Sequence, residues 1–116
     1  MTLASTTRES LARAAVEGML CALADGLGAV TRLGVSAERI LLIGGAAQNA
    51  AVQQVARRVF EVPVDIPEPG EYVAAGAARQ AAWALTGTLP AWSTSIQSHL
   101  EPDFDPAVIA NYRARG

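Results

Sequence analysis

The sequence predicts an α/β fold in which a short sheet is covered by helices. Two stretches rich in branched apolar side chains, at 39–43 and 62–66, have the pattern of strands, and segments with helical spacing lie before, between and after them. The connections are short, and such alternation builds a layered α/β domain. Because a sheet usually has about 5–6 strands, two strands predict that further strands come from sequence outside these 116 residues.

The composition excludes several classes of protein. The chain is 51% apolar and 17% charged, with a net charge of −2. This composition excludes a disordered tail and argues against electrostatic binding to nucleic acid. All nine basic residues are arginine, and without lysine there is no P-loop. The single cysteine, Cys21, cannot form an internal disulfide and is predicted to lie in the core. With no long apolar run and no secretion signal, we expect no membrane partner and a cytoplasmic location.

The segment 8–33 is predicted to form the first helix. Thr7 is a suitable N-cap, and Gly34 is suited to end the helix in a left-handed conformation. The apolar stripe repeats every four residues and is continued by a second row. Its members are Leu11, Ala15, Met19 and Leu23, continued by Leu20, Ala24 and Leu27.

The first strand, 39–43, is apolar on both faces, which predicts a central strand of a covered sheet. A helix is predicted over 49–60, with Asn49 as its N-cap. The second strand, 62–66, is interrupted by Pro63, which favours a place at the sheet edge because proline cannot donate to a strand ladder.

A third helix is predicted over 71–86, ended by Gly87. One face of it has almost no bulk, so we expect it to dock closely on the sheet. That face consists of Ala74, Gly76, Ala77, Ala78, Ala81 and Ala82. Residues 88–116 contain three prolines, several acidic residues and a short helical pattern at 106–113, and they are interpreted as a strapping tail of the domain formed by residues 1–87.

The turn between the first strand and the second helix is the only constellation that suggests chemistry. Gly44 and Gly45 remove the side-chain wall, so a ligand can approach the backbone, and the helix that follows presents its positive end. Ligands in α/β proteins also favour the carboxyl ends of strands. Taken alone, the pattern fits either a nucleotide site or a simple tight turn.

Three ordered blocks resemble the C-terminal lobe of the FGGY carbohydrate kinases, members of the actin–sugar kinase–heat-shock ATPase superfamily. LARAAVEG at 11–18 resembles the family's R-A-x-x-E-G helix, and IGGAAQN at 43–49 resembles its adenosine motif. VPV at 62–64 followed by EYVAAGAA at 71–78 resembles its P-V…E-x-x-A-x-G-A-A segment. The match covers residues 8–87, and the third block resembles the xylulokinases most among the family.

The resemblance implies the C-terminal part of an actin-like (ribonuclease H-like) ATPase lobe and transfer of the ATP γ-phosphate to a sugar hydroxyl, with Mg²⁺. By this resemblance Gly44, Gly45 and Ala46 lie against the ribose and α-phosphate, and Asn49 reaches the adenine. The catalytic base and most sugar contacts belong to the N-terminal lobe, so we expect no catalytic or metal-binding residue here. The main partner is that missing lobe, and a homodimer stays open.

The leading hypothesis is therefore the C-terminal fragment of a xylulokinase, inactive by itself. The alternatives are another FGGY kinase, for ribulose, gluconate or glycerol, and a non-catalytic nucleotide-binding or interaction module. His99 is expected to be solvated or locally bonded, and the acidic residues at 101, 103 and 105 to form a solvated loop. From chemistry alone, Glu17 and Glu71 each fit either a helix cap or an ion pair with an arginine.

Overall fold

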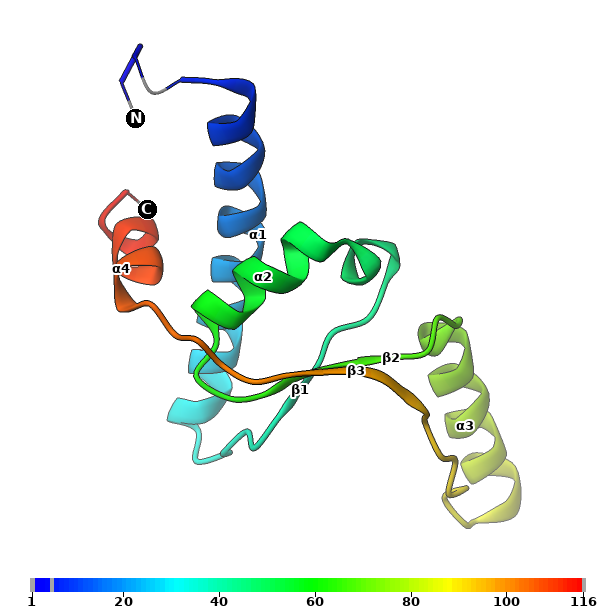
Figure 1. Cartoon of the computed structure of the whole chain (residues 1–116). Helices are drawn as coiled ribbons and strands as arrows, with labels where there is room; N and C mark the ends of the chain where they lie inside the picture. Colours follow the sequence, from blue (N-terminus) through cyan, green and yellow to red (C-terminus); the bar gives the residue numbers. More distant parts are fainter. Residues whose placement is uncertain (1, 5, 116) are drawn as a thin grey trace.

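The computed structural model describes residues 2–4 and 6–115 and confirms a mixed α/β fold (Figure 1). Within these residues the chain forms four helices, a 3₁₀ turn (η1) and a small three-stranded sheet. In chain order the elements are α1 (Arg8–Arg32), β1 (Ile40–Leu41), η1 (Gly45–Gln48), α2 (Ala50–Val59), β2 (Val64–Pro67), α3 (Tyr72–Thr86), β3 (Ile96–Leu100) and α4 (Pro106–Arg115).

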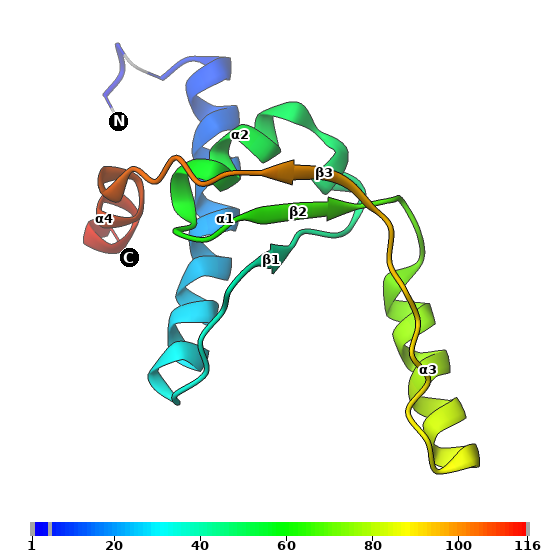
Figure 2. The same ribbon diagram turned by 60° about the horizontal axis from the view of Figure 1, so that its bottom comes forward.

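The sheet has the order β1-β2-β3, with β1 parallel and β3 antiparallel to β2 (Figure 2). The predicted positions of the first two strands are wrong, because β2 is central and buried while β1 lies at the edge, with Leu41 45% exposed. Proline does not disturb this arrangement. Pro63 precedes β2 and contributes only its carbonyl, to the amide of Ile40 at 2.9 Å, and Pro67 ends the strand beside a register shift.

Residues 88–116, expected to be a strapping tail, supply β3 and α4. The five residues of β3 are apolar only at the two ends, Ile96 and Leu100, and they complete the sheet along the free side of β2. No strand was expected in this part of the chain. The sheet therefore depends on a segment distant in sequence from the two strands that local patterns indicated.

Helices α1 and α2 pack against each other on one face of the sheet, and α4 joins them. The core formed there combines aliphatic side chains with one aromatic ring, and Cys21 is fully buried in it, as predicted. Thr7 caps α1 by accepting from the amide of Ser10 at 3.1 Å, which confirms the predicted start. The core residues are Leu20, Cys21, Val52, Val55, Ala56, Val59, Phe60 and Val64.

Only one of the two predicted apolar rows of α1 faces the core. The row at Leu20 faces the core, but Leu11 and Leu23 are 52% and 53% exposed. The reason is that α2 and α4 together cover one side of α1, and the first row of the stripe lies on another. Helix α1 also has the length and the mean hydropathy, 1.4, of a membrane span. One side of it, at Leu20 and Cys21, is buried in the core against α2 and α4.

Helix α3 does not dock on the sheet, which contradicts the prediction. It has no buried residue and projects away from the other helices (Figures 1 and 2). Its small side chains bury little area, and the described part of the chain brings no strand to that face. Instead the segment 88–95 returns alongside it, and Arg79 Nε donates to the carbonyl of Pro90 at 2.7 Å. Gly87, at φ 76°, ends α3 as predicted.

Candidate functional site

A hollow of about 460 Å³ lies where β1 and β2 end. Because these strands are parallel, their carboxyl ends meet at the same edge of the sheet, where ligands of α/β proteins bind. The turn after β1 forms one wall and the turn after β2 forms the other. The first wall consists of Leu42, Ile43, Gly44, Gly45 and Gln48, and the second consists of Pro67, Glu68, Pro69, Gly70, Glu71 and Tyr72.

The two glycines give the first wall a bare backbone surface. Gly44 has φ 103° and ψ 169°, a region that side chains other than hydrogen rarely tolerate. Gly45 has no positive φ, and a Cβ atom added at either position would meet nothing within 4 Å. The conformation thus requires glycine only at Gly44, while Gly45 leaves open space at the mouth of the hollow.

Asn49 caps the helix that follows, as predicted. Its Oδ1 accepts from the amides of Ala51 at 2.8 Å and Val52 at 3.3 Å. The four-residue turn η1, which begins at Gly45, lies between Gly44 and α2, so the start of α2 is further from the hollow than the sequence suggested. The structure brings Gly44 and Gly45 together in the hollow wall, whereas Ala46 and Asn49 lie beside it and do not line it.

The first wall is held by a short network within the turn. The amide of Ala47 donates to the carbonyl of Gly44 at 3.1 Å, and the amide of Asn49 donates to that of Ala46 at the same distance. Gln53 Nε2 reaches back from α2 to the carbonyl of buried Ala47 at 2.8 Å. The turn is therefore held by its own backbone bonds and by one side-chain bond from α2.

The second wall was missed by the sequence analysis, which assigned no role to residues 67–70. The amide of Glu68 donates to the carbonyl of Ser95 at 2.9 Å, just before β3, and the Tyr72 hydroxyl donates to the carbonyl of Glu68. Glu71 occupies the N-cap position of α3 without a side-chain cap bond. The signal that could have revealed this wall is the parallel pairing of the two predicted strands, which places both following turns at one edge.

The remaining candidate residues have local structural partners. Glu17 accepts from Arg13 Nε at 2.7 Å, which selects the ion pair over the cap. His99 is locally bonded, between Asp65 and Glu101. Among the described residues, no cluster of acidic, histidine or cysteine side chains could hold a metal ion. Burial raises the pKa of the Cys21 thiol, with the nearby acidic residues adding to the effect.

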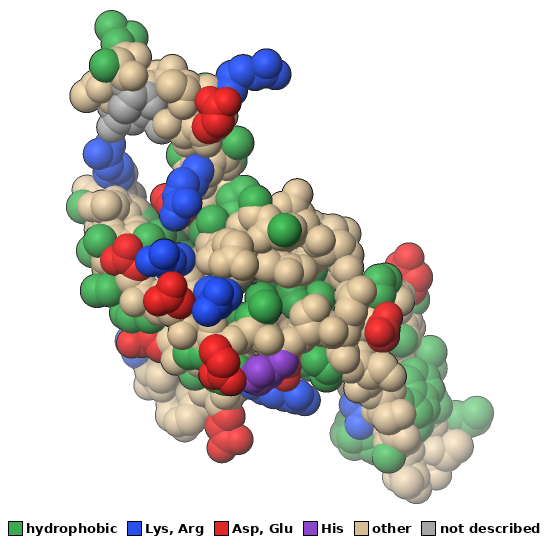
Figure 3. Space-filling model, viewed as in Figure 1, with side chains coloured by type: hydrophobic (Ala, Val, Ile, Leu, Met, Phe, Trp, Pro, Cys, Tyr) green, Lys and Arg blue, Asp and Glu red, His purple; other side chains and the backbone are tan. Residues whose placement is uncertain are grey.

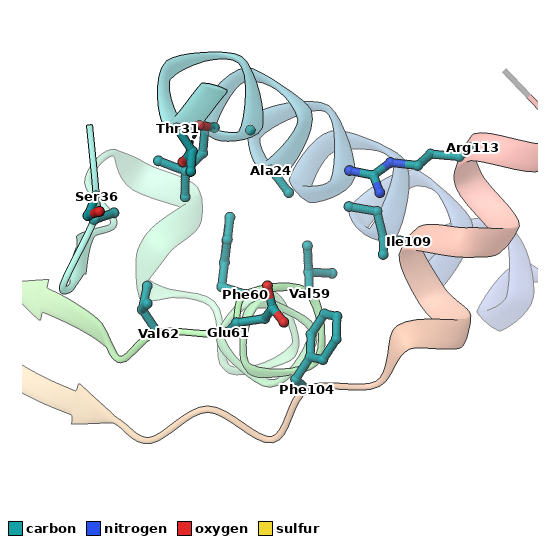
Figure 4. Close-up of a pocket in the computed structure, with 13 residues that line it drawn as sticks. Ala24, Thr31, Ser36, Val59, Phe60, Glu61, Val62, Phe104, Ile109 and Arg113 are labelled. Carbon is teal, nitrogen blue, oxygen red and sulfur yellow. Dashed lines mark hydrogen bonds between the residues drawn. The ribbon is translucent and has the colours of Figure 1, made fainter. Parts of the chain in front are cut away.

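A second hollow, of about 410 Å³, lies between α1, α4 and the end of α2 (Figure 4). Apolar side chains line most of it, with Val59, Phe60 and Ile109 directed into the space. Arg113 at its rim is engaged by Asp25, at 3.0 Å. This hollow is a gap in helix packing and adjoins none of the predicted site residues.

Comparison with known proteins identifies the family. Residues 2–85 match the model described as "FGGY family of carbohydrate kinases, C-terminal domain". The chain is 45% identical over 83 residues to a xylulose kinase of Streptomyces coelicolor and 39% identical over 102 residues to one of Streptomyces rubiginosus. These matches cover 71% and 83% of this chain but 17% and 21% of the relatives, so the chain spans about a fifth of their length.

A solved structure agrees with the fold described above. The crystal structure of xylulose kinase from Bifidobacterium adolescentis is similar with a TM-score of 0.76 and 49% sequence identity, over 100% of this chain and 24% of that one. The similarity includes the region after residue 85, where β3 and α4 lie. Sequence motifs, family model and structure coincide, and the chain belongs to the FGGY family of carbohydrate kinases, as part of its C-terminal domain.

Proposed function

We propose that the chain forms the adenosine-facing part of the nucleotide site of an ATP-dependent xylulokinase, which phosphorylates D-xylulose in the cytoplasm. The observation that carries this proposal is the bare turn at Gly44 and Gly45, which lines a hollow at the carboxyl ends of two parallel strands. Xylulose kinases are among the relatives that share this part of the chain, and the family membership supports ATP as the phosphate donor.

In this proposal the backbone at Gly44, Gly45 and Ala46 supports the ribose and α-phosphate. Asn49 Oδ1 is engaged in the helix cap, so its Nδ2 is the group left to donate to an adenine nitrogen. Mg²⁺ bound to ATP supplies charge neutralisation during phosphoryl transfer. The described residues form no cluster that would hold this metal, so we assign the metal to the nucleotide and the remainder of the enzyme.

In this proposal the chain positions the nucleotide and supplies no reacting group. Phosphoryl transfer depends mainly on positioning and electrostatic stabilisation, so a fixed nucleotide is a direct contribution to catalysis. The catalytic base and the sugar contacts are assigned to the N-terminal lobe, which is the proposed partner. The exposed row at Leu11 and Leu23 of α1 and the free edge of β1 support this, because they are apolar surfaces suited to contact further polypeptide.

Nucleotide titration followed by ¹⁵N NMR tests the site. Adding ADP should shift amide signals at residues 42–49 and 67–72 first. Gly45→Val should weaken binding about tenfold, because its side chain enters the hollow, and Gly26→Val in α1 is the control, since space around that glycine is also open. Shifts that cluster elsewhere, or equal affinities for both variants, would contradict the proposed site.

An activity assay tests the assignment of the catalytic base to the N-terminal lobe. The chain alone should transfer no phosphate from ATP to D-xylulose, whereas the intact kinase should do so in preference to other ketoses and polyols. Measurable turnover by the chain alone would refute the assignment of the catalytic base to the other lobe. A preference of the intact protein for another sugar would overturn the proposed substrate.

A further inference from the structure

A row of charged side chains crosses the sheet on the face opposite α1 and α2. Val64 points into the core, so the next residue of β2, Asp65, faces the other way, yet it is only 5% exposed. It is covered by its neighbours: His99 lies directly opposite in the register of β3, and Arg39 Nη1 lies 3.1 Å from Asp65 Oδ2. Figure 3 shows the histidine, the only one in the chain, at the surface beside acidic side chains.

His99 uses both ring nitrogens. Nδ1 bonds to Asp65 Oδ1, and Nε2 lies 2.7 Å from Oε1 of Glu101, just beyond β3. A neutral imidazole has only one N–H, so both carboxylates receive a hydrogen only when the ring is an imidazolium. Glu101 first, and then Asp65, raise the pKa of His99, while the bond from His99 is the main cause that lowers the pKa of Asp65.

The other charged groups of this region come from the neighbouring elements. Arg39, before β1, pairs with Asp65, and Arg57 of α2 donates from Nε to the backbone carbonyl of Glu101 at 2.8 Å. Arg39 thus engages a carboxylate of this group, whereas Arg57 holds the backbone of Glu101, and the imidazole lies between the carboxylates of Asp65 and Glu101. The charged form of His99 is thus the form that this arrangement favours, even though its side chain is about half exposed.

The residue just before β3 also holds one wall of the hollow. The carbonyl of Ser95 accepts from the amide of Glu68 at 2.9 Å, and the hydroxyl of Tyr72 donates to the carbonyl of Glu68. The pairing of β2 with β3 shifts register beside Pro67, so the ladder itself is irregular at the point where the wall begins. The position of residues 68–72 therefore depends on how firmly β3 is held on β2.

We propose that His99 is a positioning residue, which by bridging Asp65 and Glu101 fixes β3 on β2 and thereby sets the second wall of the hollow. What the hollow binds rests on the proposed function, but the link from His99 to the wall does not. The bridge is complete below the ordinary histidine pKa of about 6.5 and is lost as the pH rises through the higher pKa of the folded state.

Hydrogen exchange and NMR on the 116-residue chain test this link without a ligand. The imidazole signals report the titration of His99 directly, because no other histidine is present. Between pH 6 and pH 9, protection of the Glu68 amide, corrected for intrinsic exchange, should fall about two- to fivefold along the same curve, as expected for a partly exposed ion pair. The amide of Phe60, bonded within α2, should show no such step and reports that the fold is intact.

Two variants sharpen the test. His99→Gln should keep Phe60 protected while Glu68 has low protection at every pH. Asp103→Asn removes a carboxylate from the same segment, paired with Arg58 at 3.5 Å, and should behave like the parent chain. The proposal would be overturned if protection of the Glu68 amide did not change with the titration of His99, or if it still changed with pH in His99→Gln.

Titration with ADP at pH 6 and pH 9 then connects the wall to the ligand. Because the phosphate of ADP itself titrates with a pKa of about 6, the affinity of the parent chain is compared with that of His99→Gln at each pH. The ratio of parent to variant affinity should fall from pH 6 to pH 9 by the same factor as Glu68 protection in the parent chain. A wall that loosens while the affinity at the hollow stays constant would overturn the positioning role. If ADP does not bind while protection of the Glu68 amide follows the titration of His99, the proposed function fails and the link from His99 to the wall stands.

Discussion

Asn49 is assigned two roles, a helix cap and a contact to adenine, and one pair of substitutions separates them. Asn49→Ala removes both, because the side chain loses its acceptor and its donor. Of the two cap bonds, the one from Ala51, at 2.8 Å, has full strength, and the one from Val52, at 3.3 Å, is longer. We therefore expect the middle of the usual range for a lost cap, about 1 kcal/mol of the free energy of unfolding. With a typical urea dependence of about 2 kcal/mol per molar, the midpoint should move down by roughly 0.5 M.

Asn49→Asp keeps the acceptor and adds negative charge at the helix start, so the free energy of unfolding should equal or exceed that of the parent chain. It removes the Nδ2 donor, and ADP affinity should fall about tenfold, corresponding to about 1.4 kcal/mol. Asn111→Asp, an exposed substitution in α4 of the same charge, is the control for long-range repulsion. Wild-type ADP affinity in Asn49→Asp would refute the adenine contact, and wild-type stability in Asn49→Ala would refute the cap.

The remaining predictions concern stability and are measured by urea unfolding. Gly44→Ala forces a side chain into the conformation at φ 103°, and should lower the free energy of unfolding by about 1–3 kcal/mol. Gly45→Ala should lower it by less than about 1 kcal/mol. Equal losses of stability would contradict the difference in backbone strain. Phe60→Ala empties part of the core and should cost about 3–5 kcal/mol, against at most about 0.5 kcal/mol for Leu85→Ala on exposed α3, and a reversed order would contradict the described packing. Asp25→Asn breaks a surface pair with Arg113 and should cost no more than about 1 kcal/mol, a loss that high salt should reduce.

The features that the sequence predicted well are those decided by neighbouring residues. The caps at Thr7 and Asn49 and the end at Gly87 each follow from one side chain or one backbone preference within a turn of the helix. The bare turn at Gly44 and Gly45 is of the same kind, since its lack of side chains is visible in the letters themselves. Local chemistry was sufficient for each of these.

The features that were wrong or missed depend on contacts between distant segments. The exchange of central and edge strands follows from β3, which joins β2 after a long excursion through α3. The buried side of α1 depends on α4, at the other end of the chain. The pairing of Asp65 with His99 needs the strand register, which the sequence pattern of 96–100 does not determine.

The bond between Glu68 and Ser95 closes a loop that contains the whole of α3 and its return segment. Closing a flexible loop carries an entropy cost that must be met before the pairing of β2 with β3 can form. We therefore expect β1, α2 and β2 to assemble early in folding, and β3 to add last, once α3 has shortened the distance between its ends. In this order of events, the addition of β3 is the slow step in the formation of the sheet.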